Sequence, residues 1–140
     1  MVRARRIALP SMGCGSMPDS RQLFGERGEA LAIAELRRRG YRIISRNFRC
    51  RLGEIDIIAA DGDTLVFVEV KSRKGKQFGS PAAAVTSRKQ RQISRVAQYY
   101  LLKQASVNRS ARFDVVTVLC QAGALPEIEL IKNAFDRCEE

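Results

Sequence analysis

Two apolar stretches separated by a turn signal give the strongest constraint on how this chain folds. Residues 54–60 and 64–71 are rich in Ile, Val and Phe, which favours β-strand. Between them lies Asp61-Gly62-Asp63, and the dipeptide Asp-Gly is a strong signal for a two-residue hairpin loop. The sequence therefore predicts an antiparallel hairpin whose loop is Asp61-Gly62.

The predicted hairpin carries charged side chains inside two apolar strands. With this loop, Glu54 lies opposite Glu69 and Asp56 lies opposite Phe67, and successive side chains alternate between the two faces. One face then carries Ile55, Ile57, Val66, Val68 and Val70, and the other carries Glu54, Asp56, Phe67, Glu69 and Lys71. A slip of one residue would move Asp56 to the face opposite Glu69. We therefore expect Asp56, Glu69 and Lys71 to form one patch.

Such a patch suits metal-dependent chemistry. Two carboxylates can hold a hard divalent cation such as Mg²⁺, which lowers the pKa of bound water and offsets the charge of a phosphate. Lys71 could orient or deprotonate that water, or contact the phosphate. The alternative is a solvated strand face with an ordinary charge pair. Three features favour a site over that alternative. Strand 66–70 is almost wholly apolar, the carboxylates lie on neighbouring strands, and the rest of the chain is basic.

The rest of the composition narrows the chemistry. The chain has no histidine, which excludes a histidine general base, a Cys–His nucleophile and histidine-ligated zinc. The four cysteines show no zinc-ligand spacing and are interpreted as free thiols of a cytoplasmic protein. The carboxylates and Lys71 are the main catalytic candidates that remain.

Charge is unevenly distributed along the chain. The formal net charge is +10, and residues 72–112 contain ten Lys or Arg and no Asp or Glu. A small acidic site in a basic field suits a polyanion, so nucleic acid is the favoured partner, although half of these residues could be an ordinary solvated surface. A membrane surface is the weaker alternative, and no apolar run approaches the ~20 residues of a membrane span.

The segments around the hairpin complete one α/β domain. Residues 1–21 are interpreted as a flexible basic tail, with Met17 as an alternative start, and residues 22–140 as a single domain. We expect a helix over 22–39, with an apolar arc of Ala30, Ile33, Ala34 and Leu36. A second helix is expected over 86–104, with Thr86 as N-cap. Its buried stripe would consist of Ile93, Val96, Ala97, Tyr100 and Leu101. Strands are expected at 41–48, 113–119 and 127–131, and a mobile loop at 72–81. The order predicts a three-layer α/β/α sandwich with a central mixed sheet.

Several short motifs carry a family resemblance that covers roughly residues 22–120. They are Gly25-Glu26-Arg27-Gly28-Glu29, Gly40-Tyr41, Asn47-Phe48-Arg49, Gly53-Glu54-Ile55-Asp56, Phe67-Val68-Glu69-Val70-Lys71-Ser72-Arg73 and Arg112-Phe113-Asp114-Val115-Val116. Together they resemble the YraN family of uncharacterised bacterial proteins, which is related to archaeal Holliday-junction resolvases. Asp56 with Glu69-Val70-Lys71 looks like the PD-(D/E)xK motif, although Gly-Glu-Ile precedes Asp56 where some members have Pro.

The resemblance implies a restriction-endonuclease-like fold and a Mg²⁺- or Mn²⁺-dependent endonuclease, a hydrolase acting on DNA that is branched or otherwise structured. In that reading Asp56, Glu69 and the Val70 carbonyl hold the metal, Lys71 acts on water or phosphate, and Glu29 assists from the first helix. Glu26 is interpreted instead as an i,i+4 partner of nearby arginines or as an acid favoured near the helix N-terminus by the helix dipole. Related resolvases act as two-fold dimers, so the resemblance also implies a homodimer, although the sequence shows no dimer face.

Nucleic-acid contacts are expected beside this centre. Arg73, Lys74 and Lys76 follow the catalytic strand directly and could grip the phosphate backbone. The resemblance adds Lys89 and Gln90, for which an ordinary helix-surface role is about as well supported. We expect Asp114 to be a structural charge partner or a strand-edge residue. The alternatives to a nuclease are a nucleic-acid-binding module without cleavage and a subunit of a DNA repair or processing machine.

Overall fold

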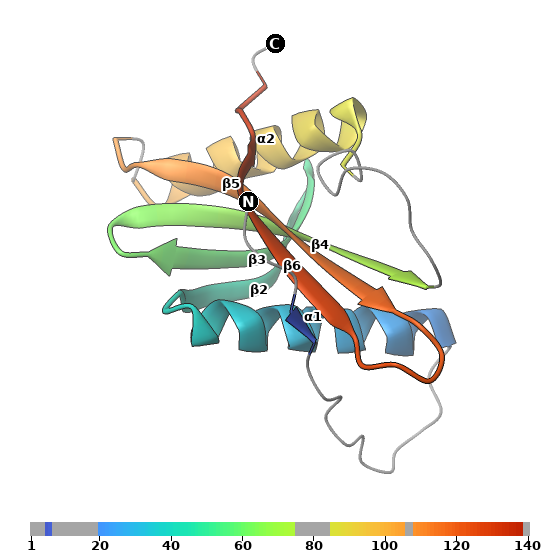
Figure 1. Cartoon of the computed structure of the whole chain (residues 1–140). Helices are drawn as coiled ribbons and strands as arrows, with labels where there is room; N and C mark the ends of the chain where they lie inside the picture. Colours follow the sequence, from blue (N-terminus) through green and yellow to red (C-terminus); the bar gives the residue numbers. More distant parts are fainter. Residues whose placement is uncertain (1–4, 7–19, 75–84, 106–107, 139–140) are drawn as a thin grey trace.

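The computed structural model describes residues 5–6, 20–74, 85–105 and 108–138. Along the chain the elements are β1 (Arg5–Arg6), α1 (Ser20–Arg38), β2 (Arg42–Cys50), β3 (Gly53–Asp61), β4 (Thr64–Lys74), α2 (Ser87–Lys103), β5 (Ala111–Cys120) and β6 (Glu127–Phe135) (Figure 1). The strand β1 was not expected, because residues 1–21 were interpreted as a tail. The predicted loop at 72–81 begins later than expected, because β4 continues to Lys74, and residues 75–81 lie outside the described part.

The strands form one mixed sheet in the order β1-β6-β5-β4-β3-β2. Strand β4 runs parallel to β5, and the other neighbouring strands are antiparallel. The predicted α/β class and mixed sheet are confirmed. The parallel pair β4–β5 is joined through α2, as a parallel connection requires a crossover. In the described part of the chain, neither helix is long and apolar enough to cross a lipid bilayer.

The two helices cover opposite faces of the sheet, so β3 and β4 are buried on both sides (Figure 1). On one face, α1 packs on a cluster that includes Ile57, Val66 and Val68. On the other, α2 packs on a cluster that includes Ile58, Phe67 and Val115. This arrangement explains the near-continuous apolar run of β4, which the sequence analysis took as the mark of a central strand.

Helix α2 matches its predicted stripe and cap. The buried residues Ile93, Val96, Ala97 and Tyr100 face the sheet, and Leu101 is partly buried. The helix begins after Thr86, whose hydroxyl accepts a hydrogen bond from the Lys89 backbone N–H at 3.2 Å. The N-cap prediction is therefore confirmed.

The face of α1 was predicted only in part. Ile33 and Leu36 are buried as expected, whereas Ala30 and Ala34 are exposed. The arc is completed by Leu31 and Ala32. A Cβ at Gly28 would collide with the Ser72 side chain, so the absence of a side chain at Gly28 lets α1 approach β4 closely. This approach brings the neighbouring Glu29 towards the strand that carries Glu69.

The hairpin forms, but its register differs from the prediction by two residues. Asp61 pairs with Thr64, Ala60 with Leu65 and Ile58 with Phe67, so the loop is Gly62-Asp63 rather than Asp61-Gly62. Gly62 has φ 60° at the first loop position, where a type II′ hairpin turn places glycine. A shift of two residues preserves which side chains share a face. It also moves Asp56 from the position opposite Phe67 to a point level with Glu69.

The predicted apolar face of β3 is wrong at Ile55. Ile57 packs in the cluster beneath α1, whereas Ile55 packs in the cluster beneath α2. The ladder between β2 and β3 pairs Arg46 with Ile57 and Phe48 with Ile55, and no pair joins the residues between them, Asn47 and Asp56. Asn47 has φ 52°, a left-handed conformation that asparagine adopts more readily than most residues. The simple alternation of β3 breaks at Asp56, level with this unpaired asparagine, whereas the register shift between β2 and β3 lies between Ile43 and Ser45.

Candidate functional site

Asp56 and Glu69 meet where the ladder between β3 and β4 ends. The last paired residues are Ile57 and Val68. One step further, the Asp56 carboxylate accepts a hydrogen bond from the Val70 backbone N–H at 2.9 Å. The Glu69 carboxyl is hydrogen-bonded to that of Asp56, and Glu69 is only 7% exposed. The structure therefore brings together the two acidic residues that the sequence analysis selected.

Burial raises the pKa of Glu69 well above its usual range, and the hydrogen bond and charge of Asp56 raise it further. Lys89 and Lys71 oppose this shift, and the Lys89 Nζ lies 3.7 Å from Glu69 Oε2. Two carboxylates in contact are costly to hold charged together without a counter-ion. A divalent cation would supply that positive charge, so the donor chemistry of the pair fits a hard metal ion.

Glu29 approaches the same point from α1. Burial raises the pKa of Glu29, the charge of Asp56 adds to this effect, and a hydrogen bond from Asn47 opposes it. These interactions place Glu29 in the electrostatic environment of Asp56. Within the described residues, however, no three acidic or cysteine side chains converge closely enough to form a group that could hold a metal ion.

Asn47 belongs to this site, although the sequence analysis used it only as part of a motif. Its side chain hydrogen-bonds to Glu29, and its backbone, in the left-handed conformation, is unpaired at the level of Asp56. One signal was available in the sequence, because a lone asparagine inside a predicted strand is a common sign of a bulge or turn. Asn47 thus connects α1 to the strand that carries Asp56.

The other predicted residues lie at different distances from the acid pair. Lys71 is partly exposed and influences Glu69 electrostatically, and Lys89 forms the ion pair described above. The Gln90 side chain donates a hydrogen bond to the Val85 carbonyl at 2.9 Å, which stabilises the turn before α2. Arg73 and Lys74 end β4. Lys76 lies outside the described residues, and no observation bears on the Val70 carbonyl as a ligand.

Asp114 has a structural role, which confirms the prediction of a charge partner. Its carboxylate is fully buried and accepts hydrogen bonds from Tyr41 Oη at 2.9 Å, Arg112 Nε at 2.8 Å and the Asn133 backbone N–H at 3.0 Å. Arg112 also binds Asp61 at 2.9 Å, at the end of β3. This network joins β3, β5 and β6 to the start of β2.

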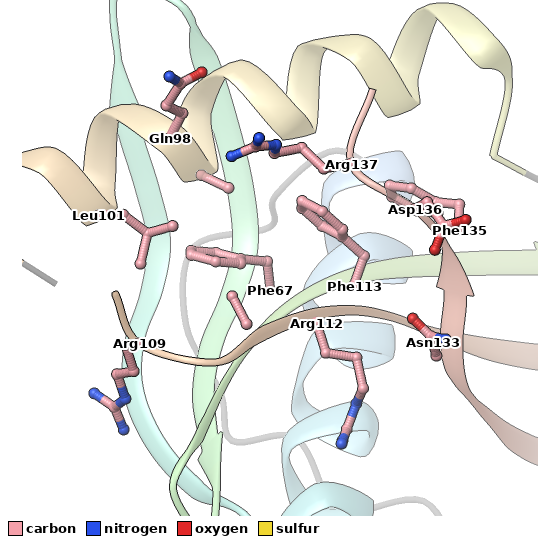
Figure 2. A pocket seen from close by; sticks show the side chains of 12 residues that line it. Phe67, Gln98, Leu101, Arg109, Arg112, Phe113, Asn133, Phe135, Asp136 and Arg137 are labelled. Atoms are coloured by element: carbon pink, nitrogen blue, oxygen red, sulfur yellow. The ribbon is translucent and has the colours of Figure 1, made fainter. Parts of the chain in front are cut away.

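A cavity of about 260 Å³ lies apart from the acid pair, between the C-terminal half of α2, the start of β5 and the end of β6. Figure 2 shows the rings of Phe67 and Phe113 along it, with Arg137 beside them. None of the predicted site residues that the structure describes lines it. The cavity is therefore separate from the candidate site.

The comparisons with known proteins agree with the motif pattern. The model of "Uncharacterised protein family UPF0102" matches residues 28–118, which include Glu29, Asn47, Asp56 and Glu69. The chain belongs to this family, and the predicted YraN-like resemblance is confirmed. A UPF0102 protein of Geotalea uraniireducens is 54% identical over 113 residues, covering 81% of this chain and 89% of the relative. UPF0102 protein GSU0650 of Geobacter sulfurreducens is 50% identical over 125 residues, covering 89% and 98%.

One solved structure is similar at low identity. Pyrococcus furiosus SfsA, determined in complex with Ca²⁺, shares 14% identity with a TM-score of 0.35. The match covers 80% of this chain and 62% of that protein. A similarity of this degree carries no argument about function, so the function must be argued from the site itself.

The role of Asn47 can be tested with two substitutions that separate its backbone from its side chain. Asn47→Gly keeps the left-handed conformation and removes the hydrogen bond to Glu29, so we expect a loss of about 1 kcal/mol of unfolding free energy. Asn47→Ala removes the same hydrogen bond and also strains the backbone, so we expect a further loss of about 1–2 kcal/mol. Urea denaturation measures both. Equal stability of the two variants would show that the backbone conformation is not required.

Proposed function

We propose that this protein is a divalent-metal-dependent nuclease that hydrolyses phosphodiester bonds of DNA, with branched or structured DNA as the preferred substrate. The observation that carries the proposal is the contact between the partly buried Asp56 and the buried Glu69 at the end of the β3–β4 ladder, with Lys71 and Lys89 nearby. Burying two acids together is costly for a purely structural purpose, so their convergence favours use by a cation or a reaction. In this proposal the fold is restriction-endonuclease-like, with the helices on both faces of the sheet as its outer layers.

Each residue of the site has a role in this proposal. Asp56 and Glu69 hold Mg²⁺ or Mn²⁺ with the Val70 carbonyl, and the cation, when bound, makes water a better nucleophile and offsets phosphate charge. Lys71 orients the attacking water or contacts the phosphate. Glu29 supports the site from α1, where Asn47 fixes its side chain.

The surroundings of the acid pair support a polyanionic substrate. Lys71, Arg73 and Lys74 follow Glu69 along β4, and Lys89 faces it from α2. Their positive charges attract a phosphate backbone towards an acidic centre that would otherwise repel it. Lys76 and Gln90 remain proposed contacts of the same backbone. A homodimer would present two such centres to a two-fold symmetric DNA junction.

A second candidate is a nucleic-acid-binding protein that does not cleave. It is favoured by the lack of a third acidic or cysteine ligand beside the acid pair in the described residues. In that case the ammonium group of Lys89, 3.7 Å from Glu69 Oε2, offsets the charge of the acid pair without a metal. The two candidates differ in one property, which is affinity for a divalent cation.

Thermal melting in the presence of Mn²⁺ distinguishes these candidates. A cation that binds only the native state raises the melting temperature, by an amount equivalent to about 2.7 kcal/mol at a concentration of 100 times Kd. We expect this rise in the wild-type protein and its loss in Asp56→Asn, whereas Asp63→Asn in the exposed hairpin loop should behave as wild type. A melting temperature that does not respond to Mn²⁺ or Mg²⁺ would leave the non-cleaving candidate.

A further inference from the structure

The outer face of α2 carries a row of arginines that starts beside the candidate site. Arg88, Arg91 and Arg95 are exposed, and they follow the spacing of three and four residues that places side chains on one face of a helix. The residues on the opposite face, among them Ile93, Val96 and Ala97, are buried against the sheet. We call Arg88, Arg91 and Arg95 the arginine stripe.

The stripe adjoins the acid pair through Lys89. This residue follows Arg88 in the chain, and its ammonium group lies 3.7 Å from Glu69 Oε2. From Arg88 the stripe runs seven residues along the helix axis, or about 10.5 Å at a rise of 1.5 Å per residue. A charged surface that starts at the proposed cleavage centre and extends away from it is placed to hold the substrate on one side of the cut.

The charge of this surface is not balanced within the helix. Residues Ser87–Lys103 contain five Lys or Arg and no Asp or Glu. Among the described side chains, no ion pair involves Arg88 or Arg91. An anionic partner would therefore meet positive charge with little competition from acids on α2 itself.

The geometry points to one strand of a DNA or RNA duplex as that partner. Phosphates of one strand repeat about every 3.4 Å along the duplex axis, so a stripe of this length laid parallel to that axis spans about three nucleotide steps. Single-stranded nucleic acid is usually bound by aromatic stacking as well as charge. The large hydrophobic residues exposed in the described part of the chain are Leu52, Leu102 and Leu125, and none of them is aromatic. Tyr99, four residues after Arg95, is only partly exposed, and its ring lies 6.4 Å from that of Phe48. Among the described residues, charge is therefore the main feature of this surface, which fits a duplex backbone.

We propose that the arginine stripe binds consecutive phosphates of a duplex arm beside the cleavage centre. The inference rests on the proposed function, because the cleavage centre at Glu69 decides which end of the stripe lies next to the cut. It adds to that function a surface that recognises the duplex without reading its sequence, since phosphate contacts position a nucleic acid but do not identify bases.

The test measures binding without cleavage. Asp56→Asn protein is titrated with a fluorescent 20-base-pair duplex and with a single strand of the same length, at several KCl concentrations. The Arg88→Gln/Arg91→Gln double variant in the same background should bind the duplex more weakly. The slope of log K against log salt should fall in magnitude by about 2, because each lost phosphate contact removes about 0.9. Circular dichroism confirms that the exposed substitutions leave the fold unchanged.

The matched control is Arg37→Gln/Arg42→Gln, which removes two exposed arginines from α1 and the start of β2. The slope of this control should stay close to that of the parent protein. Three results would overturn the inference. They are an equal loss of duplex affinity in both double variants, an unchanged salt slope in the stripe variant, and tighter binding of the single strand than of the duplex. If wild-type protein cuts no DNA but the salt slope falls in Arg88→Gln/Arg91→Gln, the nuclease proposal is wrong and the binding role of the stripe is supported. If wild-type protein cuts DNA but the salt slope is unchanged in that variant, only the binding role of the stripe is wrong.

Discussion

Replacing Asp56 with asparagine should reduce Mn²⁺-dependent DNA cleavage by at least about 100-fold. The substitution keeps the shape of the side chain and an oxygen acceptor for the Val70 N–H, but it removes the negative charge that would hold a cation. Stabilisation of the transition state by a bound metal is worth several kcal/mol, and each 1.36 kcal/mol changes the rate tenfold. Nicked, flapped and four-way DNA incubated with purified protein provide the assay.

The companion substitution Glu69→Gln should have a similar effect. Because both carboxylates would serve one cation, the double variant should be scarcely less active than either single variant. Asp63→Asn is the matched control, since it makes the same chemical change in the exposed hairpin loop. Cleavage that survives Asp56→Asn and Glu69→Gln would arise from a contaminant or from another site, and the proposed centre would be wrong.

Replacing Asp114 with alanine should destabilise the protein by about 3–5 kcal/mol, independently of any metal. The change removes the acceptor of hydrogen bonds from Tyr41, Arg112 and Asn133, and it leaves the Arg112 guanidinium, 20% exposed, without its buried partner. Unpaired buried donors carry the full cost of their desolvation. Urea denaturation at neutral pH measures the loss.

Tyr41→Phe is the control for this network. It removes one hydroxyl that donates to Asp114 and that also accepts a hydrogen bond from Arg112 at 2.8 Å, while the ring stays buried. The expected loss is only about 1 kcal/mol. Losses of equal size in Asp114→Ala and Tyr41→Phe would show that the carboxylate is not the centre of the network.

Except at Ile55, the sequence predicted which apolar hairpin residues share a face, but it did not predict how the strands pair. Alternating Val and Ile residues specify the face of each side chain, and any shift by two residues satisfies the same pattern. The choice between Asp61-Gly62 and Gly62-Asp63 depends on the turn type, which a single Asp-Gly does not determine. The grouping of Asp56 with Glu69 was therefore predictable, and their direct contact was not.

Other features depended on tertiary packing that periodicity cannot report. Ile55 lies on the face opposite Ile57, and nothing in the alternation of residues along β3 indicates that change. In α1, Ala30 and Ala34 were placed on the apolar arc because alanine is apolar, although a methyl group gains little from burial. The close contact between Gly28 and Ser72 sets the orientation of α1. That contact joins residues far apart in the chain.

The hydrogen bond between Asp56 and the Val70 N–H has a consequence for ligand affinity. It fixes the Asp56 carboxylate to the sheet, so the conformational entropy of that side chain is lost when the hairpin folds and not when a cation binds. A preorganised carboxylate binds a cation more tightly than a mobile one, but its position then depends on the integrity of the sheet. Substitutions that loosen the β3–β4 pairing far from Asp56 would therefore weaken the site as well as the fold.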